Sequence, residues 1–163
     1  MKTIYLIILI VCAAAAGCSE KKTPPAELIN QQASLPGNLP YDPFQWRVIT
    51  SGLNNQESTM FTLYGNDPAV EYARTNAQHA YPPGSVLCLV TWSRKEDKHW
   101  FGGEIPAQIK SIEFVKVNAT PANGPPYTYD VYKGTPPAKS DTEDAAGIDR
   151  INFILGLRAS VMP

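Results

Sequence analysis

An apolar run near the start of the chain decides which residues are left to build a folded domain. Residues 4–16 form an unbroken apolar stretch of 13 residues that comes after a single cation, Lys2. A membrane-spanning helix needs roughly 20 apolar residues, whereas the core of a secretory signal needs roughly 7–15. The run therefore predicts a signal peptide, residues 1–17, and the domain must be built from the later residues.

The residues that close this run predict lipid attachment to Cys18. Residues 15–17 are Ala-Ala-Gly, and small side chains just before the cut are what a signal peptidase accepts. Cys18 then supplies the thiol that an acyl transfer requires. We expect a bacterial lipoprotein held at a membrane by lipid on Cys18. An ordinary secretory signal is the alternative, and Cys12 is rejected because large aliphatic residues precede it.

The segment after the cysteine predicts an address and a spacer. Ser19, rather than an acidic residue, comes directly after Cys18, which by the sorting rule of bacterial lipoproteins favours the outer membrane. Residues 19–22 also suit a surface-export rule, so the membrane and its face stay open. Residues 18–40 are rich in Pro, Gln, Asn, Ser and Lys, which is typical of a flexible linker. The domain is then expected at residues 41–163.

Charge and cysteine content exclude two classes of function. The whole chain has a formal net charge of -1, and removal of residues 1–17 takes away one lysine and no acid, which leaves -2. Because nucleic-acid binding needs a clustered basic face, no such partner is expected. Cys88 lies in the apolar run 86–90, which predicts a buried thiol rather than a nucleophile.

Alternating and continuous apolar runs predict an antiparallel sheet. The expected strands are residues 45–51, 59–64, 85–92, 111–118 and 127–133. Residues 85–92 are apolar throughout, which favours the centre of the sheet, and 127–133 should pair with 111–118. The charged segment 94–98 is expected to be a solvated hairpin tip, and 134–144 a polar loop.

Helices complete the expected fold. Asp67 is predicted to cap a helix over residues 69–79, with Pro68 at its first position. Residues 145–161 predict a second helix with a broad apolar face. The expected class is α+β: an antiparallel sheet of about four or five strands, with a short helix and a C-terminal helix packed on it.

Three segments carry a resemblance to a known family. Residues 64–69 (YGNDPA), 81–86 (YPPGSV) and the C-terminal 157–163 resemble the cytochrome P-460 family of exported proteins, and the similarity spans residues 42–163. The family's namesakes are mono-haem c-type cytochromes that oxidise hydroxylamine. The resemblance implies haem held by a Cys-x-x-Cys-His motif near the C-terminus, with its histidine as the iron ligand, and a lysine cross-linked to the porphyrin.

This sequence departs from that pattern at the haem. Residues 147–163 contain neither cysteine nor histidine, so c-type attachment there is excluded. The strand segment 87–90 is Leu-Cys-Leu-Val and offers no lysine for a cross-link. The resemblance therefore implies the fold, whereas the redox chemistry cannot be inferred from it.

His99 is the most suggestive remaining side chain. It precedes Trp100 and Phe101, and a Gly-Gly pair comes next. An imidazole beside an aromatic wall suits the edge of a ligand pocket, where neutral histidine can ligate iron. The structural alternative is a hairpin-base histidine packed on tryptophan. His79, at a helix end, is expected to be structural, and two histidines without a thiolate predict no metal site.

The other candidate residues are expected to be structural. Glu104 and Glu113 are interpreted as ordinary surface acids because no nucleophile signature accompanies them. The bulky aromatic residues expected in the core are Trp46, Tyr64, Trp92 and Phe114. Hydrolase and nucleotide-binding motifs are missing from the sequence.

Two functional hypotheses remain. The first, which we prefer, is a lipid-anchored binding module without covalent haem that holds a small apolar or planar ligand, or a protein partner, in the former haem pocket. The second is an oxidoreductase that binds haem non-covalently, with His99 or another side chain on the iron, and acts on hydroxylamine or a similar nitrogen species. A purely structural envelope protein would lack a concave pocket.

Overall fold

The computed structural model describes residues 30–35, 37–75, 80–119, 126–140 and 144–160, so the predicted signal peptide and Cys18 lie outside the described residues. Residues Gln31–Pro163 form one compact unit. Its strands are β1 (Arg47–Asn54), β2 (Thr59–Gly65), β3 (Val86–Glu96), β4 (Glu104–Val117), β5 (Tyr127–Lys133) and β6 (Ala138–Ser140). Its helices are α3 (Asp67–Thr75) and α4 (Asp144–Gly156), with two 3-10 turns, η1 (Gln31–Ala33) and η2 (Pro43–Gln45). Over the described residues, no helix combines the length and apolarity needed to cross a membrane.

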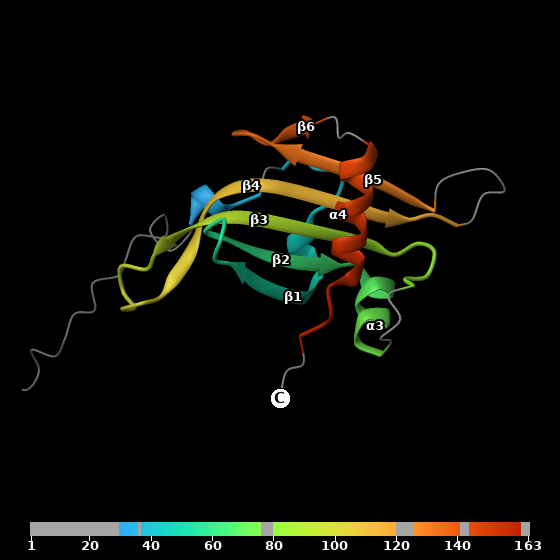
Figure 1. Ribbon diagram of the computed structural model, residues 1–163, viewed down its shortest axis with the longest axis horizontal. Helices are drawn as coiled ribbons and strands as arrows, with labels where there is room; N and C mark the ends of the chain where they lie inside the picture. The colour runs from blue at the N-terminus through green and yellow to red at the C-terminus, as the bar shows by residue number, and fades with distance from the viewer. Residues whose placement is uncertain (1–29, 36, 76–79, 120–125, 141–143, 161–163) are drawn as a thin grey trace, which may run out of the picture. The chain divides into compact units, whose positions relative to one another are not determined.

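The six strands form one antiparallel sheet in the order β1-β2-β3-β4-β5-β6 (Figure 1). The predicted α+β class is confirmed, and so are the inner position of β3 and the pairing of β5 with β4. The strand count exceeds the expected number because β6 lies inside the predicted polar loop 134–144. Gly134, with φ +94, makes the tight turn from β5 towards β6, and a positive φ favours glycine.

Side chains alternate along β3 between two apolar clusters on opposite faces of the sheet. Leu87 and Leu89 belong to the cluster under α3 and α4, whereas Cys88 and Val90 belong to the cluster on the other face. Ile154 of α4 is fully buried in the first cluster, and α4 lies across the strands (Figure 1). Cys88 is buried, as predicted, and the burial raises the pKa of its thiol.

The second face of the sheet is covered by the segment that precedes β1. Ala33, Leu35 and Leu39 pack against its buried cluster, and the indole N–H of Trp92 donates a hydrogen bond of 3.0 Å to the carbonyl oxygen of Ala33. The sequence places these residues in the linker 18–40. Their apolar side chains are spaced too irregularly to show periodicity, although each packs against the sheet.

Asn66, rather than Asp67, caps α3. Its Oδ1 accepts hydrogen bonds from the backbone N–H groups of Ala69, at 3.3 Å, and Val86, at 3.0 Å. Its Nδ2 donates to the carbonyl oxygen of Gly84 at 2.9 Å. One side chain therefore joins the YGNDPA and YPPGSV segments, which explains why both patterns occur together. Asp67 lies in the first helical turn and forms an exposed ion pair with Arg47.

Two further element boundaries differ from the prediction. The charged segment 94–98 is only partly a solvated tip. Asp97 and Lys98 lie in the turn, but β3 continues to Glu96 and Arg94 pairs with Pro106 of β4. The side chain of Arg94 is mostly buried, and its Nη1 forms an ion pair with Glu104 within the hairpin, whereas its Nε is buried without a hydrogen-bond partner in the described structure. The helix expected to reach residue 161 ends at Gly156, a residue of poor helix propensity.

Candidate functional site

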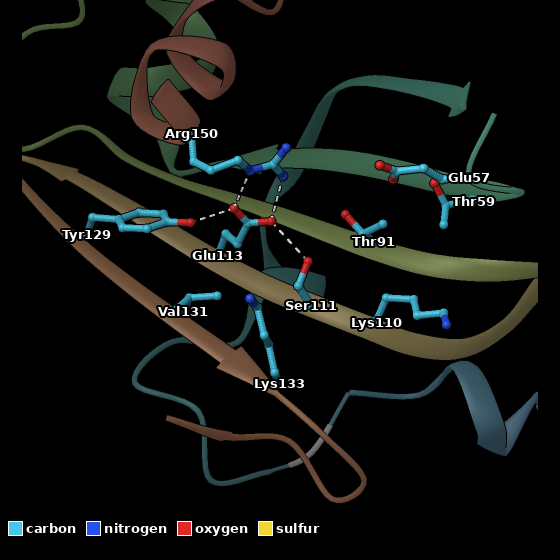
Figure 2. A pocket seen from close by; sticks show the side chains of 10 residues that line it. All are labelled: Glu57, Thr59, Thr91, Lys110, Ser111, Glu113, Tyr129, Val131, Lys133 and Arg150. Atoms are coloured by element: carbon cyan, nitrogen blue, oxygen red, sulfur yellow. Dashed lines mark hydrogen bonds and ion pairs between the residues drawn. The ribbon is translucent and has the colours of Figure 1, made fainter. Parts of the chain in front are cut away.

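A hollow of about 430 Å³ opens on the α4 face of the sheet, beside the helix (Figure 2). The side chains that line it come from β2 to β5, from the turn before β2 and from α4. They are Glu57, Thr59, Thr91, Lys110, Ser111, Glu113, Tyr129, Val131, Lys133 and Arg150. The alternation of the strands turns most of these residues to the same face as Leu89 and Val115, and a register shift between β3 and β4 at Lys110 adds that side chain. The hollow therefore continues the core surface beyond α4.

Glu113 is the centre of the hydrogen-bond network in this hollow. Arg150 approaches it from α4 and donates from Nε to Oε2 at 2.9 Å and from Nη2 to Oε1 at 2.7 Å. The Tyr129 hydroxyl donates to Oε2 at 2.6 Å and the Ser111 hydroxyl to Oε1 at 2.9 Å. Four donors thus hold one carboxylate, with a bidentate guanidinium among them (Figure 2).

The surroundings of Glu113 keep it ionised although its side chain is only 3% exposed. Burial alone would raise the pKa of the carboxyl, but the hydrogen bonds from Arg150, Tyr129 and Ser111, together with the guanidinium charge, bring the pKa below its ordinary value. Burial and the bond to the carboxylate raise the pKa of Tyr129. The bonds to Glu113 also raise the pKa of Arg150. The network therefore contains a fixed anion and a fixed cation.

The interpretation of Glu113 as an ordinary surface acid is wrong. Glu113 lies on β4 between Ile112 and Phe114, and those two side chains are buried on the opposite face. The remaining face of β4 turns Glu113 towards α4, where Arg150 neutralises it. A glutamate between two apolar residues of a strand is the pattern of a solvent-facing side chain, so the sequence alone gave no signal of this burial. The other acid, Glu104, is partly exposed as expected.

Two lysines give the hollow its free positive charge. Within the described part of the chain, neither Lys110 nor Lys133 forms an ion pair. Lys133 extends from β5 and points into the hollow (Figure 2). The lining contains three cations and two carboxylates, and Arg150 and Glu113 already neutralise one another. Thr59 and Thr91 add hydroxyl groups to the same surface.

The residues that the sequence favoured as cofactor contacts lie elsewhere. His99, Trp100 and Phe101 occupy the turn between β3 and β4, and none of them lines this hollow. Trp100 is 74% exposed and Phe101 is fully exposed, so His99 is not packed beneath an aromatic wall. Their role as a cofactor site stays a prediction. His79 lies outside the described residues.

The aromatic residues expected in the core are all found there. Trp92 and Phe114 are buried in the cluster opposite α4, and Trp46 and Tyr64 pack against it. The rings of Phe114 and Tyr132 meet edge to face, with centroids 5.9 Å apart. These rings therefore stabilise the fold and are not available to a ligand in the hollow.

The family model of cytochrome P460 matches residues 41–147, which cover most of the described sheet. The chain belongs to the cytochrome P460 family, and the predicted resemblance is confirmed. Among curated proteins, none matches the chain.

The family name suggests haem, so the donor groups must be compared with what haem requires. Covalent attachment needs cysteine thiols, and the one cysteine among the described residues, Cys88, is buried on the face opposite the hollow. The described lining contains no histidine, cysteine or methionine to ligate iron, and the hydroxyl of its one tyrosine, Tyr129, is already bonded to Glu113. Val131 is its single aliphatic side chain. The residues present in this hollow therefore do not fit a haem.

Proposed function

We propose that the chain is a lipid-anchored envelope protein whose cytochrome P460 domain binds a small anionic molecule in the hollow, without covalent haem. The observation that carries the proposal is the pair of lysines, Lys110 and Lys133, which border the hollow without an ion-pair partner in the described structure. Ligand sites are concave, with volumes of roughly 300–1,000 Å³ and a few convergent polar groups. A carboxylate or phosphate group suits ammonium and hydroxyl donors of this kind.

The Glu113 network supports this proposal by fixing the surface on which a ligand would rest. Because Arg150 is bidentate to Glu113, its guanidinium is held in one orientation while 41% of its side chain stays exposed at the edge of the hollow. A cation held in place loses less conformational freedom when an anion binds. The guanidinium, whose charge Glu113 neutralises, is therefore a fixed polar group beside the two lysines.

The ligand proposal is tested by calorimetric titration of the chain from Ser19 with citrate and with inorganic phosphate. We expect saturable binding of at least one probe, and Lys133→Met should weaken it about tenfold, or ~1.4 kcal/mol. Lys116→Met is the matched control, because Lys116 lies on β4 and is exposed. Equal losses in both variants, or no binding of either probe, would overturn the proposal.

A ferric haem titration of the same protein tests the second candidate, an oxidoreductase with non-covalent haem, which the family match favours. We expect featureless absorption changes that do not saturate. A Soret shift that saturates at one equivalent and disappears in His99→Ala would instead assign haem to the β3–β4 turn.

The anchor is tested on the full chain expressed in a bacterial host. We expect the mature protein to begin at Cys18 and to carry the mass of attached acyl chains, and we expect Cys18→Ala to abolish both the acyl mass and the membrane association. A mature chain that begins after a cut elsewhere, or that carries no acyl mass, would contradict the anchor. This outcome does not bear on the ligand, which is measured on the chain from Ser19.

A further inference from the structure

The turn between β3 and β4 presents two adjacent aromatic side chains to solvent. Trp100 and Phe101 are the most exposed of the large hydrophobic residues in the described structure. They lie at the end of the hairpin formed by the two longest strands, which extends beyond the rest of the sheet (Figure 1). Adjacent bulky apolar side chains on an exposed turn are costly to leave in water and indicate a surface that meets another apolar phase.

Hydrogen bonds within the turn hold these rings outwards. The N–H of Asp97 donates to the carbonyl oxygen of Gly103 at 2.8 Å, and the N–H of Gly103 donates to that of Trp100 at 2.9 Å. The Asp97 side chain accepts from the N–H of His99 at 2.8 Å. Gly102 adopts φ +73, a conformation that glycine tolerates best. A turn with defined hydrogen bonds therefore holds the two rings in their exposed positions.

The chain enters the domain beside the same hairpin. Lys95 donates from Nζ to the side-chain oxygen of Gln32 at 3.2 Å, and η1 lies next to the strands of this hairpin (Figure 1). Gln31 comes 13 residues after Cys18. A chain of that length spans at most roughly 45 Å. Lipid on Cys18 would thus keep this end of the domain near a membrane surface.

From these observations we infer that Trp100 and Phe101 insert into the lipid interface of the membrane to which the chain is tethered, an inference that rests on the proposed anchor. Tryptophan is favoured at the level of the lipid headgroups, and a buried phenylalanine gains from removal of its surface from water. The flanking charges do not oppose contact with anionic lipid. They consist of three cations and three anions, namely Arg94, Lys95, Lys98, Glu96, Asp97 and Glu104.

The contact needs only modest affinity because the tether keeps the hairpin at the surface. Two aromatic side chains bind lipid weakly, but a tethered site meets the membrane at a high effective concentration. The lipid and the turn would then fix the domain at two points, and the domain would keep one orientation to the bilayer. This orientation is a property that the anchor alone does not supply.

The test uses the unlipidated chain from Ser19, which contains every described residue of the domain, with phosphatidylethanolamine and phosphatidylglycerol vesicles that carry brominated acyl chains. Lipid is added to millimolar concentration, which takes the place of the tether. Bromine quenches tryptophan fluorescence at short range, and the chain has three tryptophans. Trp92 is buried and Trp46 is partly buried, whereas Trp100 is exposed. We expect quenching that Trp100→Phe abolishes, and Phe101→Ser should weaken vesicle binding about tenfold.

Ile148→Ser is the matched control, because Ile148 is an exposed apolar side chain on α4, away from the turn. This variant should bind vesicles as the unchanged chain does. Unquenched fluorescence at high lipid concentration, or an equal loss of binding in Ile148→Ser, would overturn the inference. Since the chain from Ser19 lacks Cys18, these outcomes are independent of the acyl mass that tests the anchor.

Discussion

Replacing Arg150 with methionine will lower the free energy of unfolding by about 3 kcal/mol at neutral pH. The substitution leaves the Glu113 carboxylate buried with two neutral donors, the hydroxyls of Tyr129 and Ser111. A buried charge that loses its partner typically costs about 3–5 kcal/mol, and the partial exposure of Arg150 places the expected loss at the lower limit. Urea unfolding followed by circular dichroism measures the change.

Two comparison variants separate the buried charge from a general effect of losing arginine. Arg47→Met removes an ion pair of 3.1 Å with Asp67 in which both side chains are exposed, and it should cost less than about 0.5 kcal/mol. Glu113→Leu combined with Arg150→Met removes both charges and should unfold less easily than Arg150→Met alone. If Arg150→Met is no less stable than Arg47→Met, the guanidinium does not support the carboxylate.

Acidification should narrow the difference in the free energy of unfolding between the unchanged chain and Arg150→Met. In the unchanged chain burial alone would raise the pKa of Glu113, but the hydrogen bonds from Arg150, Tyr129 and Ser111, together with the charge of Arg150, lower it. Its stabilising contribution is present above the ordinary glutamate pKa of about 4.3 and is lost as the pH falls through the lowered value. In Arg150→Met, burial dominates and raises the pKa, so protonation on acidification favours the folded state. The difference in the free energy of unfolding should therefore decrease as the pH falls from about 7 towards about 4.

A chain that begins at Pro40 will be less stable than one that begins at Gln31, again by about 3 kcal/mol. The shorter chain lacks Ala33, Leu35 and Leu39, which cover the apolar cluster on the face opposite α4. It also lacks the carbonyl oxygen that accepts from the Trp92 indole. Thermal and urea unfolding of the two chains measure the loss.

Trp92→Phe in both chains divides that loss into its two parts. In the longer chain the variant loses the indole hydrogen bond of 3.0 Å to Ala33 as well as packing, whereas in the shorter chain it loses packing alone. The cost of the substitution should therefore be larger in the longer chain by about 1 kcal/mol. Equal stability of the two unsubstituted chains would support the prediction that the linker 18–40 is a spacer along its whole length.

The strands with regular patterns could be predicted from the sequence, and those with broken patterns could not. β5 was predicted with its observed bounds because aromatic and polar residues alternate along 127–133. The first half of β4 was missed, since Pro106 and the Ala-Gln pair at 107–108 interrupt the alternation. The strand forms there because β3 also continues, and each supplies the other with hydrogen-bond partners.

Prediction of the hollow from the sequence would have needed information that no single segment carries. Glu113 and Arg150 are 37 positions apart, and only the packing of α4 across the sheet brings them together. Each residue is a charge beside apolar residues, and this pattern did not show burial or which opposite charge would pair with it. To predict that Lys110 and Lys133 border the same hollow, the register between β4 and β5 would also have to be known. His99 was favoured because its neighbours are aromatic, although those rings point to solvent.

The order of the strands has a consequence for how the chain reaches its native state. Each strand pairs with its neighbour in sequence, so most pairings close a short loop and can form soon after their two strands are available; the exception is β2–β3, whose connection contains α3. The contact between the hydroxyls of Thr50 and Ser160, 2.9 Å apart, joins positions separated by 110 residues. Closure of the C-terminal segment on β1 should therefore be a late event in folding. Refolding followed by amide protection would show the β3–β4 and β4–β5 hairpins protected before β1 is.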